Sequence, residues 1–339
     1  MTGFGKQLLK LSSILALSYA FTFTANASVF GSLAPGGDIV EDEGFVTLST
    51  GPTVQYFSKG EQGTKPLMLF IHGAPERAEV WEDYMRFFSH DYFTVAYTTR
   101  GYHPSSIPQN VSDYTVTNLA ADALAVAQSF GYDSFTVVGH DWGAATAWRA
   151  AINYPDAVER LVVLSNPHPV MYARAYHESP EHRALIDAYI PLARDSVAPW
   201  TREGTLANDL DHFKNYVYPS ETKKDLSWAM ADAFEETWSF DSGASIDAIY
   251  NHYKALDWPL TTLNTCNPAP WISLTVDQPT ILFYGEQDRF VGPEAYTLDN
   301  NDCNTNTIYV PFADGNHFIH HEYKEEIIWK MWYFLNQTD

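Results

Sequence analysis

The sequence is short of cysteine, and this shortage excludes disulfide-rich scaffolds and cysteine-based zinc modules. Its 339 residues contain two cysteines, Cys266 and Cys303. We favour one disulfide in an oxidising compartment, because both cysteines lie in polar, loop-like sequence, and two free, buried thiols are the alternative. Because no clustered histidines accompany them, we expect no metal site, and we expect no cofactor.

Positive charge is also scarce. The chain has 20 Lys and Arg residues against 42 Asp and Glu residues, a formal net charge of −22. Such a chain repels phosphate backbones, and no basic patch remains to recruit anionic lipid. We therefore expect no nucleic-acid partner. The 45% hydrophobic content argues against disorder and fits a large folded core.

Long apolar runs are missing except at the start of the chain. Lys6 and Lys10 precede an apolar stretch at 11–23 that is too short to span a bilayer, and Ala-Asn-Ala follows at 25–27. This order of features predicts a signal peptide over residues 1–27, cleaved after Ala27. We expect a periplasmic or secreted protein without stable membrane insertion. The oligomeric state stays open, and a homodimer is compatible with the sequence.

Short apolar runs alternate with helical spacing along most of the chain. The runs have little polar alternation, as in strands buried on both faces, and lie at Leu67–Ile71, Phe93–Tyr97, Phe135–Val138, Thr280–Tyr284 and Thr307–Val310. Helical spacing occurs at Leu119–Phe130, Trp142–Tyr154 and Glu325–Leu335. The alternation predicts an α/β fold with a mostly parallel sheet flanked by helices.

The segment between Pro167 and about Thr275 has a different pattern. It has no strand-like runs, many aromatic residues, and helical stretches near Glu181–Leu192, Thr222–Trp238 and Ser245–Ala255. This pattern predicts a helical cap inserted into the α/β core. We expect a first part of the core at 28–167, the cap at 168–275 and the second part of the core at 276–339.

The sequence Gly-His-Asp-Trp-Gly at 139–143 lies between a predicted strand and a predicted helix. Its glycines have the spacing of a nucleophile elbow, a strained turn that holds one side chain above the sheet. The central residue is Asp141 where a serine is usual. An aspartate that only caps the following helix is the alternative. No GxSxG segment occurs in the chain, which argues against a serine esterase or lipase.

Three other candidate residues follow predicted strands. Ala74, in His-Gly-Ala-Pro at 72–75, is placed to direct a backbone N–H at the reacting group, and with the N–H of Trp142 it would form an oxyanion hole. Asp288 comes after Gly285, and His317 follows the last predicted strand. The order nucleophile, acid, histidine matches the α/β-hydrolase fold.

With these residues the chain resembles the epoxide hydrolase and dehalogenase branch of the α/β-hydrolases. The resemblance rests on HGAP at 72–75, RGYHPSS at 100–106, GHDWG at 139–143, NYPDAVERLVVLSNPHP at 153–169, FYGEQDRFV at 283–291 and the His317 segment. It implies an ester formed on Asp141 and hydrolysed by water that His317, oriented by Asp288, activates. His103, Thr99 and Asn316 depart from the family pattern without altering a catalytic atom.

The resemblance also implies that two cap tyrosines protonate the epoxide oxygen. Tyr253 matches the second ring-opening segment, whereas Tyr189 matches the first only with a one-residue shift. Some relatives use a histidine at the first position, so His177 and His182 stay as alternatives. We expect the substrate itself to contact His72, Pro75 and Trp142.

Two rival functions must be considered. One uses the same catalytic residues, and the other involves no catalysis. A haloalkane or haloacetate dehalogenase would share Asp141 and His317. However, Ala74 stands where haloalkane enzymes usually have asparagine, and Trp142 and Ala145 stand where a haloacetate enzyme needs arginines. A non-catalytic secreted binding protein is disfavoured because every expected catalytic residue type is present. We expect a hydrolase that converts a small apolar epoxide and water into a vicinal diol.

Overall fold

The computed structural model describes residues 41–207, 243–256, 265–267, 273–297, 303–304 and 306–337. The predicted signal peptide at 1–27 and the predicted helix at Thr222–Trp238 lie outside these residues. No helix in the described ranges is long and apolar enough to cross a membrane.

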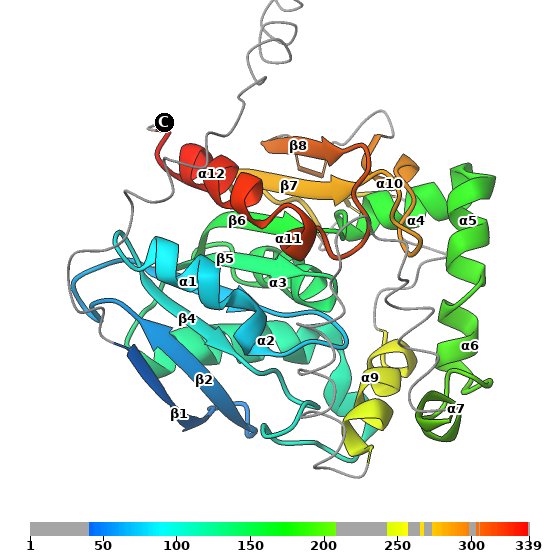
Figure 1. The fold of residues 1–339 in the computed structure, drawn as a ribbon, viewed down its shortest axis with the longest axis horizontal. Coiled ribbons are helices and arrows are strands. Elements are labelled where there is room, and N and C mark those ends of the chain that lie inside the picture. The colour runs from blue at the N-terminus through cyan, green and yellow to red at the C-terminus, as the bar shows by residue number, and fades with distance from the viewer. Residues whose placement is uncertain are drawn as a thin grey trace, which may run out of the picture. The chain divides into compact units, whose positions relative to one another are not determined.

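An eight-stranded sheet organises the fold, in the order β1-β2-β4-β3-β5-β6-β7-β8 (Figure 1). Its six strands from β4 to β8 pair in parallel, and β1 and β2 join them as an antiparallel pair at one edge. The strands are β1 (Glu41–Thr47), β2 (Thr53–Lys59), β3 (Leu67–Ile71), β4 (Phe93–Tyr97), β5 (Phe135–His140), β6 (Val158–Leu164), β7 (Thr280–Gly285) and β8 (Thr307–Phe312). The predicted α/β class with a mostly parallel sheet is confirmed.

Helices cover both faces of this sheet. The core helices are α1 (Glu82–Phe88), α2 (Val116–Ser129), α3 (Trp142–Asn153), α10 (Glu294–Thr297), α11 (Ile319–Glu322) and α12 (Lys324–Leu335), with 3₁₀ turns η2 (Ala78–Trp81) and η3 (Val111–Tyr114). In β3, Leu67, Leu69 and Ile71 enter the core beneath α2 and α3. Met68 and Phe70 enter the core beneath α1 and α12. This two-sided burial explains why the predicted strands read as unbroken apolar runs.

The described residues between β6 and β7 are largely helical, as expected for a cap. They form α4 (Pro169–Glu178), α5 (Pro180–Asp187), α6 (Ile190–Arg194), α7 (Arg202–Leu206) and α9 (Ala244–Lys254). Within this insertion α9 contacts α6, and it also contacts η3 of the core. Cys266 and Cys303 form a disulfide, with their Cα atoms 5.1 Å apart. Of the two alternatives for the cysteines, the structure therefore has the bridge.

The structure corrects the sequence analysis at two places. The single helix predicted at Glu181–Leu192 is two helices, because α5 ends at Asp187 and α6 begins at Ile190. Pro191 explains the break, since its ring would clash with the carbonyl of Asp187 in a continuous helix. The strands β1, β2 and β6 were not predicted. The residues of β1 are mostly polar and exposed, so this strand lacks the apolar run from which the other strands were predicted.

Candidate active site

Asp141 occupies a strained turn between β5 and α3. Its backbone has φ 52° and ψ −116°, a conformation that L-residues rarely adopt. The flanking glycines permit the close approach, because a Cβ on Gly139 would lie 2.3 Å from the carbonyl oxygen of Gly143. A Cβ on Gly143 would lie 2.1 Å from the carbonyl oxygen of Ile71. The Asp141 side chain makes no capping hydrogen bond to α3, so it is not an ordinary helix cap.

The two carboxylate oxygens of Asp141 have different partners. Oδ1 accepts the backbone N–H of Ala74 at 2.8 Å. Oδ2 lies 3.3 Å from Nε2 of His317. Burial raises the pKa of Asp141, but the hydrogen bond and charge of His317 and the Ala74 N–H together lower it below its usual value. The carboxylate is therefore ionised at neutral pH and needs no base to become a nucleophile.

His317 is held from its other nitrogen by Asp288. Nδ1 of His317 lies 2.7 Å from Oδ2 of Asp288. The remaining oxygen of Asp288, Oδ1, accepts the backbone N–H groups of Phe290 at 2.7 Å and Val291 at 3.1 Å. Burial lowers the pKa of His317, but the charges of Asp288 and Asp141 on either side raise it to about 10. The imidazole is thus protonated while both carboxylates are charged.

The main chain of His317 is also fixed. Its carbonyl oxygen accepts hydrogen bonds from Oγ of Ser165 at 2.7 Å and from Nε2 of His140 at 3.0 Å. Because a carbonyl can only accept, His140 must carry a proton on Nε2. The loop after β8 is therefore tied to the ends of β5 and β6, and this tie positions the imidazole over Asp141.

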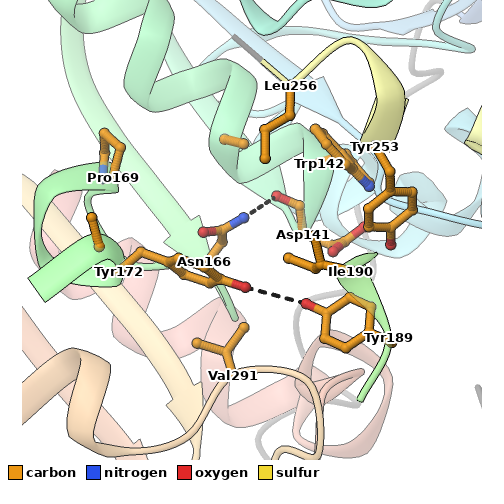
Figure 2. Close-up of a pocket in the computed structure, with 12 residues that line it drawn as sticks. Asp141, Trp142, Asn166, Pro169, Tyr172, Tyr189, Ile190, Tyr253, Leu256 and Val291 are labelled. Carbon is orange, nitrogen blue, oxygen red and sulfur yellow. Dashed lines mark hydrogen bonds between the residues drawn. The ribbon is translucent and has the colours of Figure 1, made fainter. Parts of the chain in front are cut away.

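Two small cavities meet at Asp141. One, of about 70 Å³, is lined by residues that include Asp141, Trp142, Tyr172, Tyr189 and Tyr253. Figure 2 shows Tyr253 beside the Asp141 carboxylate, and the hydroxyl of Tyr189 directed at Tyr172. The second, of about 40 Å³, also touches Asp141, Tyr189 and Tyr253, and adds Ala74, Pro75, Phe290 and His317. Asp141, His317 and the phenols of Tyr189 and Tyr253 thus face one space between core and cap.

The aromatic rings from the cap pack closely in this space. The rings of Tyr189 and Tyr253 are perpendicular, with centroids 6.1 Å apart. The hydroxyl of Tyr189 is 3.2 Å from that of Tyr172 and 3.5 Å from the carbonyl oxygen of Phe290. Burial raises the pKa of Tyr189 and of Tyr253 well above 10, and the nearby charge of Asp141 adds to this. Both phenols keep their protons at neutral pH.

Comparison with known proteins agrees with this geometry. Residues 66–323 match the α/β hydrolase fold family. The chain belongs to the α/β-hydrolase family. It is 26% identical to epoxide hydrolase 4 of Mus musculus, over 85% of this chain and 77% of that protein. It is also 26% identical to an epoxide hydrolase of Caballeronia sordidicola, over 82% of this chain and 90% of that protein.

A solved structure shares the fold of this α/β-hydrolase over most of its length. It is a mutant of an epoxide hydrolase from Bacillus megaterium, complexed with its product (R)-3-[1]naphthyloxy-propane-1,2-diol. The TM-score is 0.74 at 26% identity, and the match covers 87% of this chain and all of the other.

The structure brings most of the predicted site residues of this α/β-hydrolase together, but not His72. That side chain is buried, its Nδ1 lies 2.9 Å from the carbonyl oxygen of Gly73, and its Nε2 accepts the backbone N–H of Thr99 at 3.0 Å. Burial lowers its pKa to about 4. His72 does not line either cavity, whereas Pro75 and Trp142, the other two expected substrate contacts, do.

The three candidates for the first ring-opening residue differ in their position relative to the cavities. His177 is exposed on α4. His182 is buried, and its Nδ1 accepts the backbone N–H of Gly292 at 3.2 Å. Neither histidine is among the described residues that line the cavities, whereas Tyr189 lines both. Tyr189 lies at the break between α5 and α6.

Two residues of the site were not expected. Tyr172 hydrogen-bonds Tyr189 from α4, and Asn166 donates from Nδ2 to the backbone carbonyl of Asp141 at 3.0 Å. Both line the larger cavity. Asn166 lies in the Asn-Pro-His-Pro segment at 166–169, directly after β6, so its position at a strand's carboxyl end was the available signal. Tyr172 had no signal beyond being one of several cap tyrosines.

Proposed function

We propose that this α/β-hydrolase is an epoxide hydrolase that forms a covalent ester on Asp141. The observation that carries the proposal is a buried, ionised carboxylate facing two protonated phenols across one cavity. A carboxylate can attack an sp³ carbon directly, and a phenol can protonate the oxygen that leaves. The names of the relatives, and the diol bound in the Bacillus megaterium enzyme, support the same reaction class.

Ring opening is the first half-reaction. Oδ1 of Asp141 is engaged by the Ala74 N–H, so Oδ2 is the oxygen that attacks an epoxide carbon. The new carbon–oxygen bond forms as the ring carbon–oxygen bond breaks, and the departing oxygen takes a proton from Tyr253 or Tyr189. The products of this step are a hydroxyalkyl ester and a tyrosinate. Oδ1 becomes the ester carbonyl oxygen.

Hydrolysis of the ester is the second half-reaction. Esterification removes the negative charge of Asp141, so the pKa of His317 falls and the imidazolium passes its proton to the tyrosinate. The neutral imidazole can then accept a proton from water. Hydroxide then attacks Cγ of Asp141, and the negative charge that develops on Oδ1 is stabilised by the N–H groups of Ala74 and Trp142. Collapse of the tetrahedral intermediate transfers its hydroxyl proton to the departing alkoxide, which releases the diol and regenerates the carboxylate. His317 keeps the proton taken from water, as in the free enzyme.

Isotope labelling tests the covalent route directly. A single turnover with enzyme in excess over an epoxide, in H₂¹⁸O, should give a diol without ¹⁸O, because its new oxygen comes from Asp141. The label should instead appear in the peptide that contains Asp141. Direct attack of water on the epoxide would put ¹⁸O into the diol in the first turnover and would contradict the proposal. Wild-type enzyme after many turnovers is the matched control, since labelled carboxylate then labels the diol.

A dehalogenase would need donors for a departing halide. Trp142 offers a single indole N–H, and its ring packs edge-on against that of Tyr253 with centroids 5.1 Å apart. The Ala74 side chain offers no donor. We therefore favour an epoxide over a haloalkane substrate. Parallel assays of diol formation and halide release, on a styrene-type epoxide and a bromoalkane, distinguish the two reactions. Halide release that exceeds diol formation would reverse this choice.

We also propose that the protein is exported. The predicted signal peptide at 1–27 motivates this, and the Cys266–Cys303 disulfide is typical of an oxidising compartment. N-terminal sequencing of the protein recovered from the periplasm or medium should begin at Ser28. Recovery in the cytoplasm with residues 1–27 intact would contradict export.

A further inference from the structure

A second cluster of a carboxylate and histidines lies near His317 and is connected to it through His140. Glu76 follows the loop that carries Ala74, and α11 supplies His320 and His321 (Figure 1). Oε2 of Glu76 is 3.1 Å from Nε2 of His320, and Oε1 is 2.6 Å from Nε2 of His321. One ligand atom from each of the three residues lies within 4.8 Å of the other two.

Every ion-pair or hydrogen-bond partner of the Glu76 carboxylate in the described structure is a histidine. The side chain is 5% exposed, so it depends on these partners for the charge compensation that water would give. The imidazoles of His140, His320 and His321 lie in a row, with neighbouring centroids 4.1 Å apart. This arrangement places three imidazole nitrogens around one buried carboxylate.

The hydrogen-bond pattern of His140 adds a second observation. Its Nε2 donates to the carbonyl oxygen of His317. Its Nδ1 is buried and lies 3.4 Å from Oε2 of Glu76. The same oxygen is 3.1 Å from Nε2 of His320, so it lies close to two imidazole nitrogens inside a buried site. Imidazole nitrogen and carboxylate oxygen are ligand types that transition-metal ions take.

We propose that Glu76, His320 and His321 bind a divalent transition-metal ion. Two imidazole nitrogens and one carboxylate oxygen suit Zn²⁺, Co²⁺, Ni²⁺ or Fe²⁺, whereas Ca²⁺ and Mg²⁺ prefer oxygen ligands alone. Bonds of about 2.0–2.2 Å to such an ion place its ligand atoms about 3–3.5 Å apart. The Glu76–His320 pair already has this spacing, and the partly exposed His321 has room to adjust.

The site is distinct from the reacting groups. None of its three ligands lines the cavities at Asp141. It connects to them through His140. The ring of His140 packs at a tilt against that of His320, with centroids 4.1 Å apart, and its Nε2 hydrogen-bonds the carbonyl of His317. The ion would therefore stiffen the loop that carries His317 without taking part in bond breaking. The sequence analysis expected no metal site, because no clustered histidines accompany the two cysteines. Glu76 and His321 are 245 positions apart, and only the fold joins them.

Metal uptake by the chelator-treated, folded protein tests the proposal. Equilibrium dialysis against Zn²⁺ should give one ion per chain, and Co²⁺ should give visible absorption bands of a nitrogen- and oxygen-ligated ion. Both readouts are independent of turnover. The absence of stoichiometric Zn²⁺ uptake by the wild-type protein would overturn the proposal.

Variants identify the ligands. His321→Asn, at the partly exposed ligand, should weaken Zn²⁺ binding by roughly 100-fold or more, since even outer-sphere partners contribute 10- to 100-fold. Glu76→Gln should do the same if it folds, as circular dichroism will report. His177→Asn removes an exposed histidine of α4 and should leave the affinity unchanged. Equal affinity of His321→Asn and wild type, or equal loss in His177→Asn, would overturn the assignment.

Discussion

The loop after β8 contributes to two histidine–carboxylate clusters that differ in their arrangement. At one, a single imidazole, His317, lies between two carboxylates, and its pKa rises to about 10. At the other, a single carboxylate, Glu76, lies among several imidazoles, and burial lowers the pKa of His320. The first cluster opens into a cavity, and the ligand atoms of the second do not. The two clusters contain the same residue types. We infer that their different roles follow from the number of carboxylates for each imidazole and from whether a cavity reaches the cluster.

Of the substitutions in the two clusters, removal of the Asp141 carboxylate should have the largest effect on the rate of diol formation. Asp141→Ala deletes the nucleophile, so diol formation should fall by about 10⁴-fold or more. Steady-state assays measure the loss, with His321→Asn as a control that changes the other cluster. The α3 helix should remain folded, because the Asp141 side chain does not cap it. Diol formation near the wild-type rate in Asp141→Ala would refute the role proposed for this carboxylate.

Removing the base should slow only the second half-reaction. In His317→Gln, Asp141 can still attack the epoxide, but the ester that forms on it is hydrolysed slowly. The value of kcat should therefore fall by about 10³- to 10⁴-fold. Intact-protein mass spectrometry should then show an adduct of the epoxide's mass on the peptide containing Asp141. Asp288→Asn should accumulate the same adduct, more slowly. If neither variant forms an adduct, His317 does not act after ester formation.

The cap hydroxyls should have a smaller, shared effect. Tyr253→Phe or Tyr189→Phe should slow ring opening by about 10²-fold, because one phenol still donates. The double variant should lose more than either single one in a rapid-mixing assay of ester formation. Tyr172→Phe is the matched control, since its hydroxyl reaches the site only through Tyr189. An effect of Tyr172→Phe as large as that of Tyr189→Phe would reassign the donor.

The smallest expected change is a shift in the pKa of His317. Asp141→Asn removes one of the two negative charges beside the imidazole, so the pKa should fall from about 10 by about 1 to 3 pH units. NMR titration of the imidazole measures this directly. In chelator-treated protein, His321→Asn should leave the value unchanged, because it then removes no charge beside His317. A pKa of His317 insensitive to Asp141→Asn would contradict the proposed release of the base by esterification.

Four of the residues predicted for the site lie close together in the structure, for a structural reason. Ala74, Asp141, Asp288 and His317 each follow a strand, and the carboxyl ends of parallel strands meet at one edge of the sheet. Order along the chain was therefore sufficient to place them together. All the strands and core helices that were predicted are confirmed within three residues at each end.

The remaining features depend on contacts that have no local pattern. The break before Pro191 moved Tyr189 out of a helix, and helical spacing alone did not reveal it. His72 follows a strand as Ala74 does, yet its ring turns into the core toward Thr99. Glu76 meets His320 and His321 only because the HGAP loop and α11 pack together. Such partners are set by tertiary packing and not by periodicity.

The interruption between α5 and α6 has a consequence for redesign. Tyr189 is carried on a short irregular segment, whereas Asp141 is fixed by glycines that admit no other side chain. Substitutions at Ile190, which lines the larger cavity, can reshape the cavity wall without moving the carboxylate. Libraries that broaden the range of accepted epoxides should therefore be concentrated on this segment, and the strand-end loops should be left unchanged.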